Sequence, residues 1–122
     1  MSLLSNQAIE FRQAYGIPNT LNGRTRQRNL IVEEFKEFLE ADQNMILMHP
    51  QDREACLKEL ADLVYVCAQY AENMDWDIEQ ALRRVHKSNM SKLGEDGKPI
   101  KREDGKVLKG PNYQPPDLSD LV

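Results

Sequence analysis

The sequence has few of the residues that disulfide and many metal sites use. Its 122 residues include only two cysteines and two histidines. Cys56 and Cys67 fall within one predicted helix and are about 16 Å apart along its axis, which is too far for a disulfide between them. The motif Glu-x-x-His, used by di-iron carboxylate bundles, does not occur. These absences argue against a disulfide scaffold and disfavour a redox metal bundle.

Long apolar runs are also missing. No stretch approaches the roughly 18 consecutive apolar residues that a membrane span needs. The first residues, MSLLSNQAIEF, lack the basic segment and apolar run of a signal peptide. We therefore expect a cytoplasmic protein without a membrane partner. The 40% hydrophobic and 30% charged content is typical of a globular chain, and 122 residues suit one domain.

Charge is distributed unevenly along the chain. Residues 1–82 carry 7 basic and 14 acidic side chains, whereas residues 83–122 carry 9 basic and 6 acidic ones. An acidic body with a basic C-terminal part is a poor general nucleic-acid binder, so we expect no nucleic-acid partner. The asymmetry suits a site that gathers cations and holds an anionic ligand. It also suits an alternative, a protein-interaction module built from an acidic helix and a basic tail.

Hydrophobic periodicity predicts four helices, over about residues 5–15, 25–43, 52–73 and 77–93, with Ser5 and Asp77 as N-caps. Beyond Leu93 an octad nearly repeats, as EDGKPIKR and EDGKVLKG, and each Asp-Gly pair favours a tight turn. We predict an all-α fold, a four-helix bundle with an irregular, hairpin-containing C-terminal tail. Residues 1–93 would hold the helices, and residues 94–122 would be a basic extension of the same domain.

The second predicted helix contains the acidic stretch IVEEFKEFLEAD. On a helical wheel its apolar side chains form one expected core face: Ile31, Val32, Phe35, Phe38 and Leu39. Glu33 and Glu40 fall opposite that face and are expected in solvent. Glu34 and Glu37 fall on its flank, one turn apart.

The third predicted helix places Glu59 in the middle of an apolar face, with Asp62 three residues on. A buried carboxylate must be protonated, paired or bound to a cation. Lys58 is about 100° away on the wheel and is expected to point elsewhere. If the second and third helices pack as an antiparallel pair, four carboxylates converge and suit Mg²⁺ or Mn²⁺. The alternative is an ion pair of Glu59 with an arginine from another helix: Arg24, Arg26 or Arg28.

The fourth predicted helix ends with two polar residues, Asn89 and Lys92, that continue its apolar stripe. An asparagine there can bind a base or sugar edge, and a lysine can meet phosphate. The alternative is a helix-ending asparagine with a lysine that extends its charge to solvent.

These motifs resemble a known superfamily. EEFKE followed by ELAD is similar to the E-E-x-x-E … E-x-x-D signature of the all-α nucleoside triphosphate pyrophosphohydrolases, the MazG-like fold. VHKSNMSKLG and GKPIKREDGKVLKGPNYQPPDL resemble its phosphoribosyl-ATP pyrophosphohydrolase-like branch, so the resemblance covers about residues 25–118. It implies that Mg²⁺, or Mn²⁺ in its place, is bound by four carboxylates: Glu34, Glu37, Glu59 and Asp62.

The resemblance also implies a reaction and further site residues. The reaction is attack of water on the α-phosphorus of a nucleoside triphosphate, which yields the monophosphate and pyrophosphate. We ourselves expect a deoxynucleotide substrate, with a purine slightly favoured over a pyrimidine. Glu33, Glu34 and Glu37 would be catalytic, although the wheel turns Glu33 outward. Lys92 and Lys109 would hold phosphates and Asn89 the nucleoside. The resemblance further implies a homodimer or homotetramer. A non-catalytic metal-binding bundle and the interaction module are the alternatives.

Overall fold

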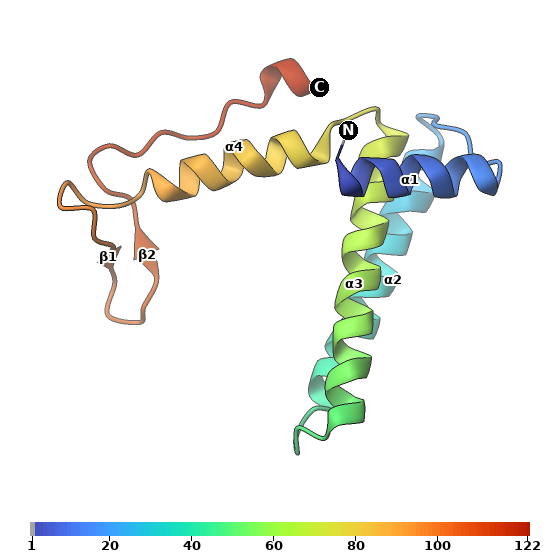
Figure 1. Ribbon diagram of the computed structural model, residues 1–122, viewed down its shortest axis with the longest axis horizontal. Helices are drawn as coiled ribbons and strands as arrows, with labels where there is room; N and C mark the ends of the chain where they lie inside the picture. Colours follow the sequence, from blue (N-terminus) through green and yellow to red (C-terminus); the bar gives the residue numbers. More distant parts are fainter. Residues whose placement is uncertain (1) are drawn as a thin grey trace. The chain divides into compact units, whose positions relative to one another are not determined.

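The computed structural model describes residues 2–122. Within them lie four helices, α1 (Leu3–Ala14), α2 (Gly23–Gln43), α3 (Pro50–Asn73) and α4 (Ile78–Met90), as Figure 1 shows. The remaining elements are the short strands β1 (Ile100–Lys101) and β2 (Val107–Leu108) and a 3₁₀ turn, η1 (Ser119–Leu121). The predicted all-α fold with four helices is therefore confirmed.

The chain forms two compact units, one ending at Ile78 and the other comprising Glu79–Val122. The boundary between these units precedes most of α4, whereas the sequence suggested a change at residue 93. A single domain over both parts stays a prediction.

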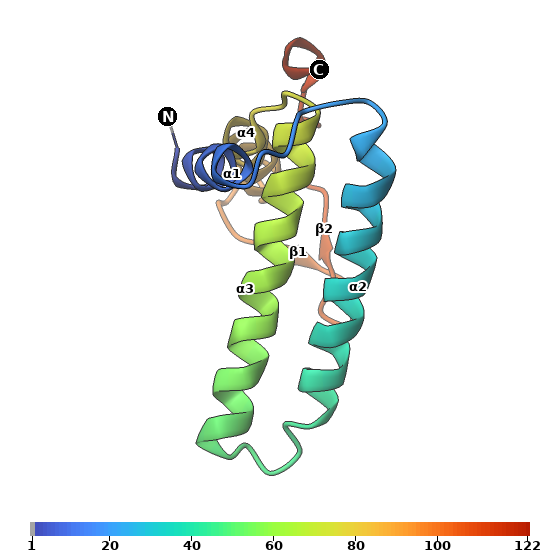
Figure 2. The ribbon, with the colours of Figure 1, turned by 90° about the vertical axis from the view of Figure 1, so that its right-hand side faces the viewer.

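In the first unit, α2 and α3 run side by side in opposite directions and form a helical hairpin (Figure 2). The short α1 packs across α3 near the C-terminal end of α3, where the ring of Phe11 meets the ring of Tyr65 edge-on at 5.7 Å. Because the antiparallel packing sets residues of α2 opposite residues of α3, it decides which side chains of the two acidic motifs meet.

The helix ends differ from the prediction in two places. α1 starts at Leu3 with Ser2 in the N-cap position, so Ser5 lies inside the first turn and its prediction as the N-cap was wrong. α4 ends at Met90 rather than at Leu93. There the hydroxyl of Ser91 donates to the carbonyl of Ser88 at 2.6 Å, a local bond that competes with helix continuation.

A buried arginine closes the end of the helical hairpin that lies near α1. Arg12 is 3% exposed, and its guanidinium donates to Asn19 Oδ1 at 2.7 Å, Pro18 O at 2.9 Å, Asn73 Oδ1 at 2.9 Å and Gln69 Oε1 at 3.3 Å. Burial lowers the pKa of Arg12, and the charge of a nearby glutamate opposes that shift. These bonds tie α1 and the loop after it to α3. No apolar pattern in the sequence signals this network.

The predicted core face of α2 is only partly buried. Ile31 and Phe38 are half-buried, but Val32, Phe35 and Leu39 are exposed, Phe35 by 47%. The prediction that all five form the core was therefore wrong for three of them. The reason is the rotation of α2 about its own axis. The side of α2 that faces α3 contains buried Gln27 and half-buried Glu34, so the apolar residues further round the helix are left uncovered.

The second unit combines α4 with the predicted hairpin and the tail. β1 and β2 pair antiparallel, with Ile100 opposite Leu108, and Gly105 closes the turn with φ of +88°, a conformation that favours glycine. Gly110 then lies against the end of α4, where its N–H donates to Lys92 O at 2.8 Å. A Cβ on Gly110 would lie 2.3 Å from Leu93 O, so any larger residue would collide with the backbone.

None of the helices in residues 2–122 is long and apolar enough to cross a membrane. Both cysteines are free, as expected from their spacing: Cys56 is buried and Cys67 is half-buried.

Candidate metal centre

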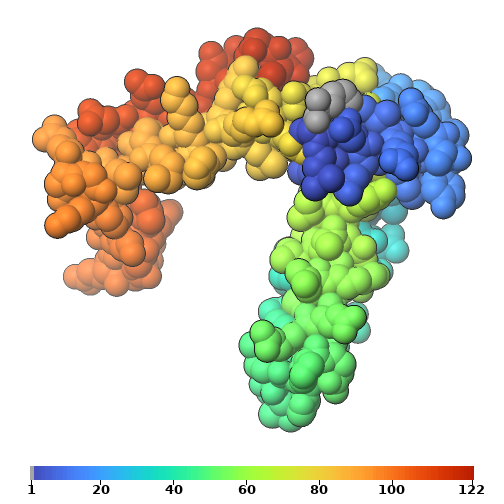
Figure 3. Space-filling view, viewed as in Figure 1, coloured from blue at the N-terminus to red at the C-terminus, as the bar shows by residue number. Residues whose placement is uncertain are grey.

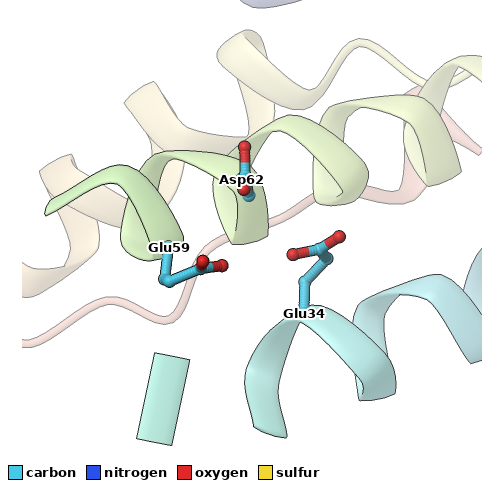
Figure 4. Close-up of side chains that lie close together, drawn as sticks. All are labelled: Glu34, Glu59 and Asp62. Atoms are coloured by element: carbon cyan, nitrogen blue, oxygen red, sulfur yellow. The ribbon is translucent and has the colours of Figure 1, made fainter. Parts of the chain in front are cut away.

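Three carboxylates from two helices meet in the middle of the helical hairpin. Glu34 on α2 and Glu59 and Asp62 on α3 each offer one oxygen atom, and the three atoms lie within 4.8 Å of one another. Figure 4 shows Glu34 and Glu59 pointing toward each other across the space between the helices. We call these three residues the carboxylate cluster. Three of the four carboxylates predicted to converge therefore do so, and Glu37 is not among them.

Two oxygens of the carboxylate cluster are buried without a hydrogen-bond partner. They are Glu34 Oε2 and Glu59 Oε2. A buried carboxylate oxygen without a partner is costly, and a cation removes that cost. Oxygens bound to one Mg²⁺ at its usual bond lengths lie about 3 to 4 Å apart, so small side-chain shifts from the present spacing suffice. The residues therefore fit a hard divalent cation.

The crowding of negative charge shows in Glu34. Burial, a hydrogen bond with Glu37, and the charges of Glu37, Asp62 and Glu59 together raise the pKa of Glu34 from 4.5 to about 7. At neutral pH this carboxyl is therefore poised between its protonated and ionised forms. A bound cation would favour the ionised form, since metal ligands must be deprotonated.

Glu37 lies beside the carboxylate cluster rather than within it. Its side chain is exposed, and it helps to raise the pKa of Glu34. A cavity of about 250 Å³ opens next to it, lined by both helices: Glu37, Glu40, Ala41, Asn44, Asp52, Ala55 and Glu59. Glu37 and Glu59 therefore line the same cavity. The cavity also provides access from solvent.

The prediction that Lys58 points away from the acidic residues was wrong. Its Nζ lies 2.7 Å from Asp62 Oδ2 and 3.6 Å from Glu59 Oε1, so it does not point away from the acidic residues. The hydrogen bond to Asp62 and the charges of Asp62 and Glu59 raise the pKa of Lys58. The spacing of four residues between Lys58 and Asp62 was the available signal, because residues four apart are neighbours on a helix surface.

The alternative ion pair of Glu59 is not formed. Among the ion pairs of residues 2–122, none joins Glu59 to Arg24, Arg26 or Arg28. The cation near Glu59 is Lys58, from its own helix.

A family model for phosphoribosyl-ATP pyrophosphohydrolase matches residues 6–89, more than half of the chain. The chain belongs to this family. The match includes every residue of the carboxylate cluster, and the resemblance drawn from the acidic motifs is confirmed. None of the curated proteins compared with the chain matches it. Membership of the family implies pyrophosphohydrolase activity on a phosphoanhydride bond of a nucleotide.

The other predicted site residues of this pyrophosphohydrolase lie outside the carboxylate cluster. Glu33 is exposed on α2, as the wheel suggested. In the second unit, Asn89 is exposed and Lys92 is half-buried. The bond from Gly110 to Lys92 places Lys109 next to Lys92 along the backbone, and Lys109 Nζ lies 4.8 Å from the ring centre of Tyr113. Two predicted phosphate ligands thus share one part of the second unit, and their role stays a prediction.

Proposed function

We propose that this pyrophosphohydrolase cleaves a nucleoside triphosphate between its α- and β-phosphates and releases the monophosphate and pyrophosphate. The observation that carries the proposal is the carboxylate cluster, in which two buried oxygens lack a hydrogen-bond partner. The cluster lies in a chain that belongs to a pyrophosphohydrolase family. Water attacks the α-phosphorus, the bond to the bridging oxygen breaks, and pyrophosphate leaves with the bonding electrons. A purine deoxynucleoside triphosphate is the slightly favoured substrate.

Within this proposal, Mg²⁺ is held by four carboxylates from α2 and α3: Glu34, Glu37, Glu59 and Asp62. When bound, Mg²⁺ acts as a Lewis acid that neutralises phosphate oxygens and makes water a stronger nucleophile; Mn²⁺ can replace it. A carboxylate that the metal does not saturate accepts the proton of the attacking water. Glu33, Glu34 and Glu37 are the candidates for this role. Glu37 is supported by its exposed position beside the carboxylate cluster.

The substrate-binding residues of the proposal come from the second unit. Lys92 and Lys109 bind phosphate oxygens through their ammonium groups, and Asn89 binds the nucleoside through its amide. The N–H of Gly110, the residue after Lys109, donates to Lys92 O, and this proximity of the two lysines along the backbone supports a shared role.

The first experiment measures pyrophosphate release from the eight common ribo- and deoxyribonucleoside triphosphates and from phosphoribosyl-ATP, with Mg²⁺, with Mn²⁺ and with EDTA. We expect release that needs the metal and a matching monophosphate. Reaction in ¹⁸O-labelled water locates the attack, since attack at the α-phosphorus places the label in the monophosphate and attack at the β-phosphorus places it in pyrophosphate. Label in the pyrophosphate would contradict the proposal.

If none of the substrates releases pyrophosphate, a thermal melt distinguishes the two remaining alternatives. A melting temperature that rises with Mg²⁺ would leave a non-catalytic metal-binding bundle, because a ligand that binds the native state stabilises it by mass action. A melting temperature that does not respond would favour the module of acidic helix and basic tail.

We also propose that the protein works as a homodimer or homotetramer. Both helices of the helical hairpin expose apolar side chains at helical spacing: Val32, Phe35 and Leu39 on α2, and Leu57, Leu60 and Val64 on α3. The loop between these helices, coloured green at the free end of the helical hairpin in Figure 3, exposes three more: Ile46, Leu47 and Met48. Exposed apolar side chains in such number suit an interface, and a second copy of the chain offers the same side chains in return.

Light scattering tests the oligomer. We expect a mass of at least two chains for the unaltered protein and a smaller mass for Phe35→Glu, because a charge cannot be buried in an apolar interface without a partner. A single-chain mass for the unaltered protein would contradict the proposal.

A further inference from the structure

Lys58 touches two of the three members of the carboxylate cluster. Its Nζ is 2.7 Å from Asp62 Oδ2 and 3.6 Å from Glu59 Oε1. Its side chain is 66% exposed, whereas that of Glu59 is 21% exposed. The ammonium therefore lies at the solvent edge of the cluster, whereas Glu59 keeps one carboxylate oxygen buried.

Ordinary helix geometry explains only one of the two contacts. Residues four apart on a helix are neighbours, so Lys58 and Asp62 would meet on an isolated helix as well. Adjacent residues on a helix do not face each other, yet Lys58 also approaches Glu59. A long, flexible lysine takes such a position where negative charge is concentrated, and Glu34 on the facing helix adds to that charge.

We propose that Lys58 is a resident counter-cation of the carboxylate cluster, which a divalent metal ion displaces. This inference rests on the metal site of the proposed function. In the metal-free protein, the ammonium neutralises Asp62 and Glu59 and allows the carboxylates of α2 and α3 to remain close.

Metal and ammonium compete because they need the same oxygens. A divalent ion bound to either oxygen of Asp62 lies within a few ångströms of an ammonium bound to the same carboxylate. The two cations therefore repel each other. Lys58 leaves easily, since its side chain is mostly exposed and has solvent to enter. Lys58 therefore weakens metal binding and stabilises the metal-free protein.

Titration with Mn²⁺, followed by the spin resonance of the free ion, tests the inference without any substrate. We expect Lys58→Gln to bind Mn²⁺ about fivefold more tightly or better, because the competitor is gone. Lys58→Arg keeps a cation at the same place and should bind close to the unaltered protein. In metal-free buffer, Lys58→Gln should melt at a lower temperature than the unaltered protein, and saturating Mn²⁺ should remove the difference.

Lys36→Gln is the matched control. Lys36 is exposed on α2, its loss changes the net charge equally, and the ion pairs of residues 2–122 do not include it. We expect a change in Mn²⁺ affinity of less than about twofold for this variant, from long-range charge alone. Glutamine is a good helix former, so neither variant threatens its helix.

Equal Mn²⁺ affinities for Lys58→Gln and Lys36→Gln would overturn the role of Lys58. If the unaltered protein then still binds Mn²⁺ and hydrolyses a nucleotide, the proposed function stands and only this inference fails. If the unaltered protein binds no Mn²⁺, the metal site and the inference fail together.

Discussion

Replacing Glu34 by glutamine should stabilise the metal-free protein at alkaline pH. The pKa of Glu34 rises from 4.5 to about 7 on folding. At about 1.36 kcal/mol per unit, this shift corresponds to a ceiling of about 3.4 kcal/mol of lost stability once Glu34 is ionised in the folded protein. Solvent at the edge of the site weakens such interactions, so we expect a gain of about 1 to 2 kcal/mol for Glu34→Gln at pH 8.

The sign of the pH dependence follows from the raised pKa. A carboxyl that holds its proton more tightly when folded favours the folded state below pH 4.5, and this contribution is lost as the pH rises through about 7. The free energy of unfolding of the metal-free protein should therefore fall over this range. Glu34→Gln removes that slope, because the amide does not titrate and can donate to the facing carboxylates. At pH 4.5 and below, the variant should gain nothing.

Urea unfolding followed by circular dichroism, with EDTA and at a fixed protein concentration, measures the effect. Glu33→Gln is the control, since Glu33 is the adjacent residue on α2 and is exposed. With saturating Mg²⁺ the order should reverse, because a native-state ligand at about 100 times its dissociation constant adds about 2.7 kcal/mol, and the variant has lost a metal ligand. A Glu34→Gln protein no more stable than Glu33→Gln in EDTA at pH 8 would refute the reasoning.

Four other predictions concern the metal, the buried network and the second unit. The affinity for Mg²⁺, measured by calorimetry, should rise as Glu34 ionises and level off above about pH 7; an affinity independent of pH would contradict this. Glu59→Gln should abolish nucleotide hydrolysis while its circular dichroism stays unchanged, and retained turnover in pure protein would exclude Glu59 as a metal ligand. Arg12→Met should lower the free energy of unfolding by about 3 kcal/mol, because it leaves buried acceptors such as Asn73 Oδ1 with fewer donors; a loss below about 1 kcal/mol in urea would contradict the network. Gly110→Ala should displace the β-hairpin, since its Cβ would lie 2.3 Å from Leu93 O, and unchanged amide NMR shifts in residues 92–110 would contradict this.

Much of the fold was accessible from local sequence. Apolar residues at helical spacing located all four helices, and the two Asp-Gly pairs located two turns of the tail, where Gly97 and Gly105 adopt positive φ. These features depend on residues a few positions apart, so a single chain segment contains the information. The ends were less accessible: Ser2 rather than Ser5 precedes α1, since several nearby residues can start a helix equally well.

The sequence indicated which residues could form the candidate site, but it did not indicate how their side chains are arranged. The spacing of Glu59 and Asp62 on one helix, and of Glu34 and Glu37 on another, indicated a cation site. The orientation of Lys58 was missed, because a helical wheel represents each residue by its Cβ direction and ignores the length of a lysine side chain. The buried Arg12 network was missed because its members are up to 61 positions apart in the chain.

The sequence by itself determined that the chain is helical, that its acidic residues come in pairs at helical spacing, and that its C-terminal part turns at two Asp-Gly pairs, since each depends on short-range backbone geometry. Only the tertiary structure decided which of those residues meet. The rotation of α2 against α3 brings Glu34 but not Glu37 into the cluster with Glu59 and Asp62, and it leaves Phe35 exposed where a core residue was expected. Helix packing selects one of several possible rotations from the summed contacts along the whole interface, and a helical wheel for each segment alone does not contain that sum.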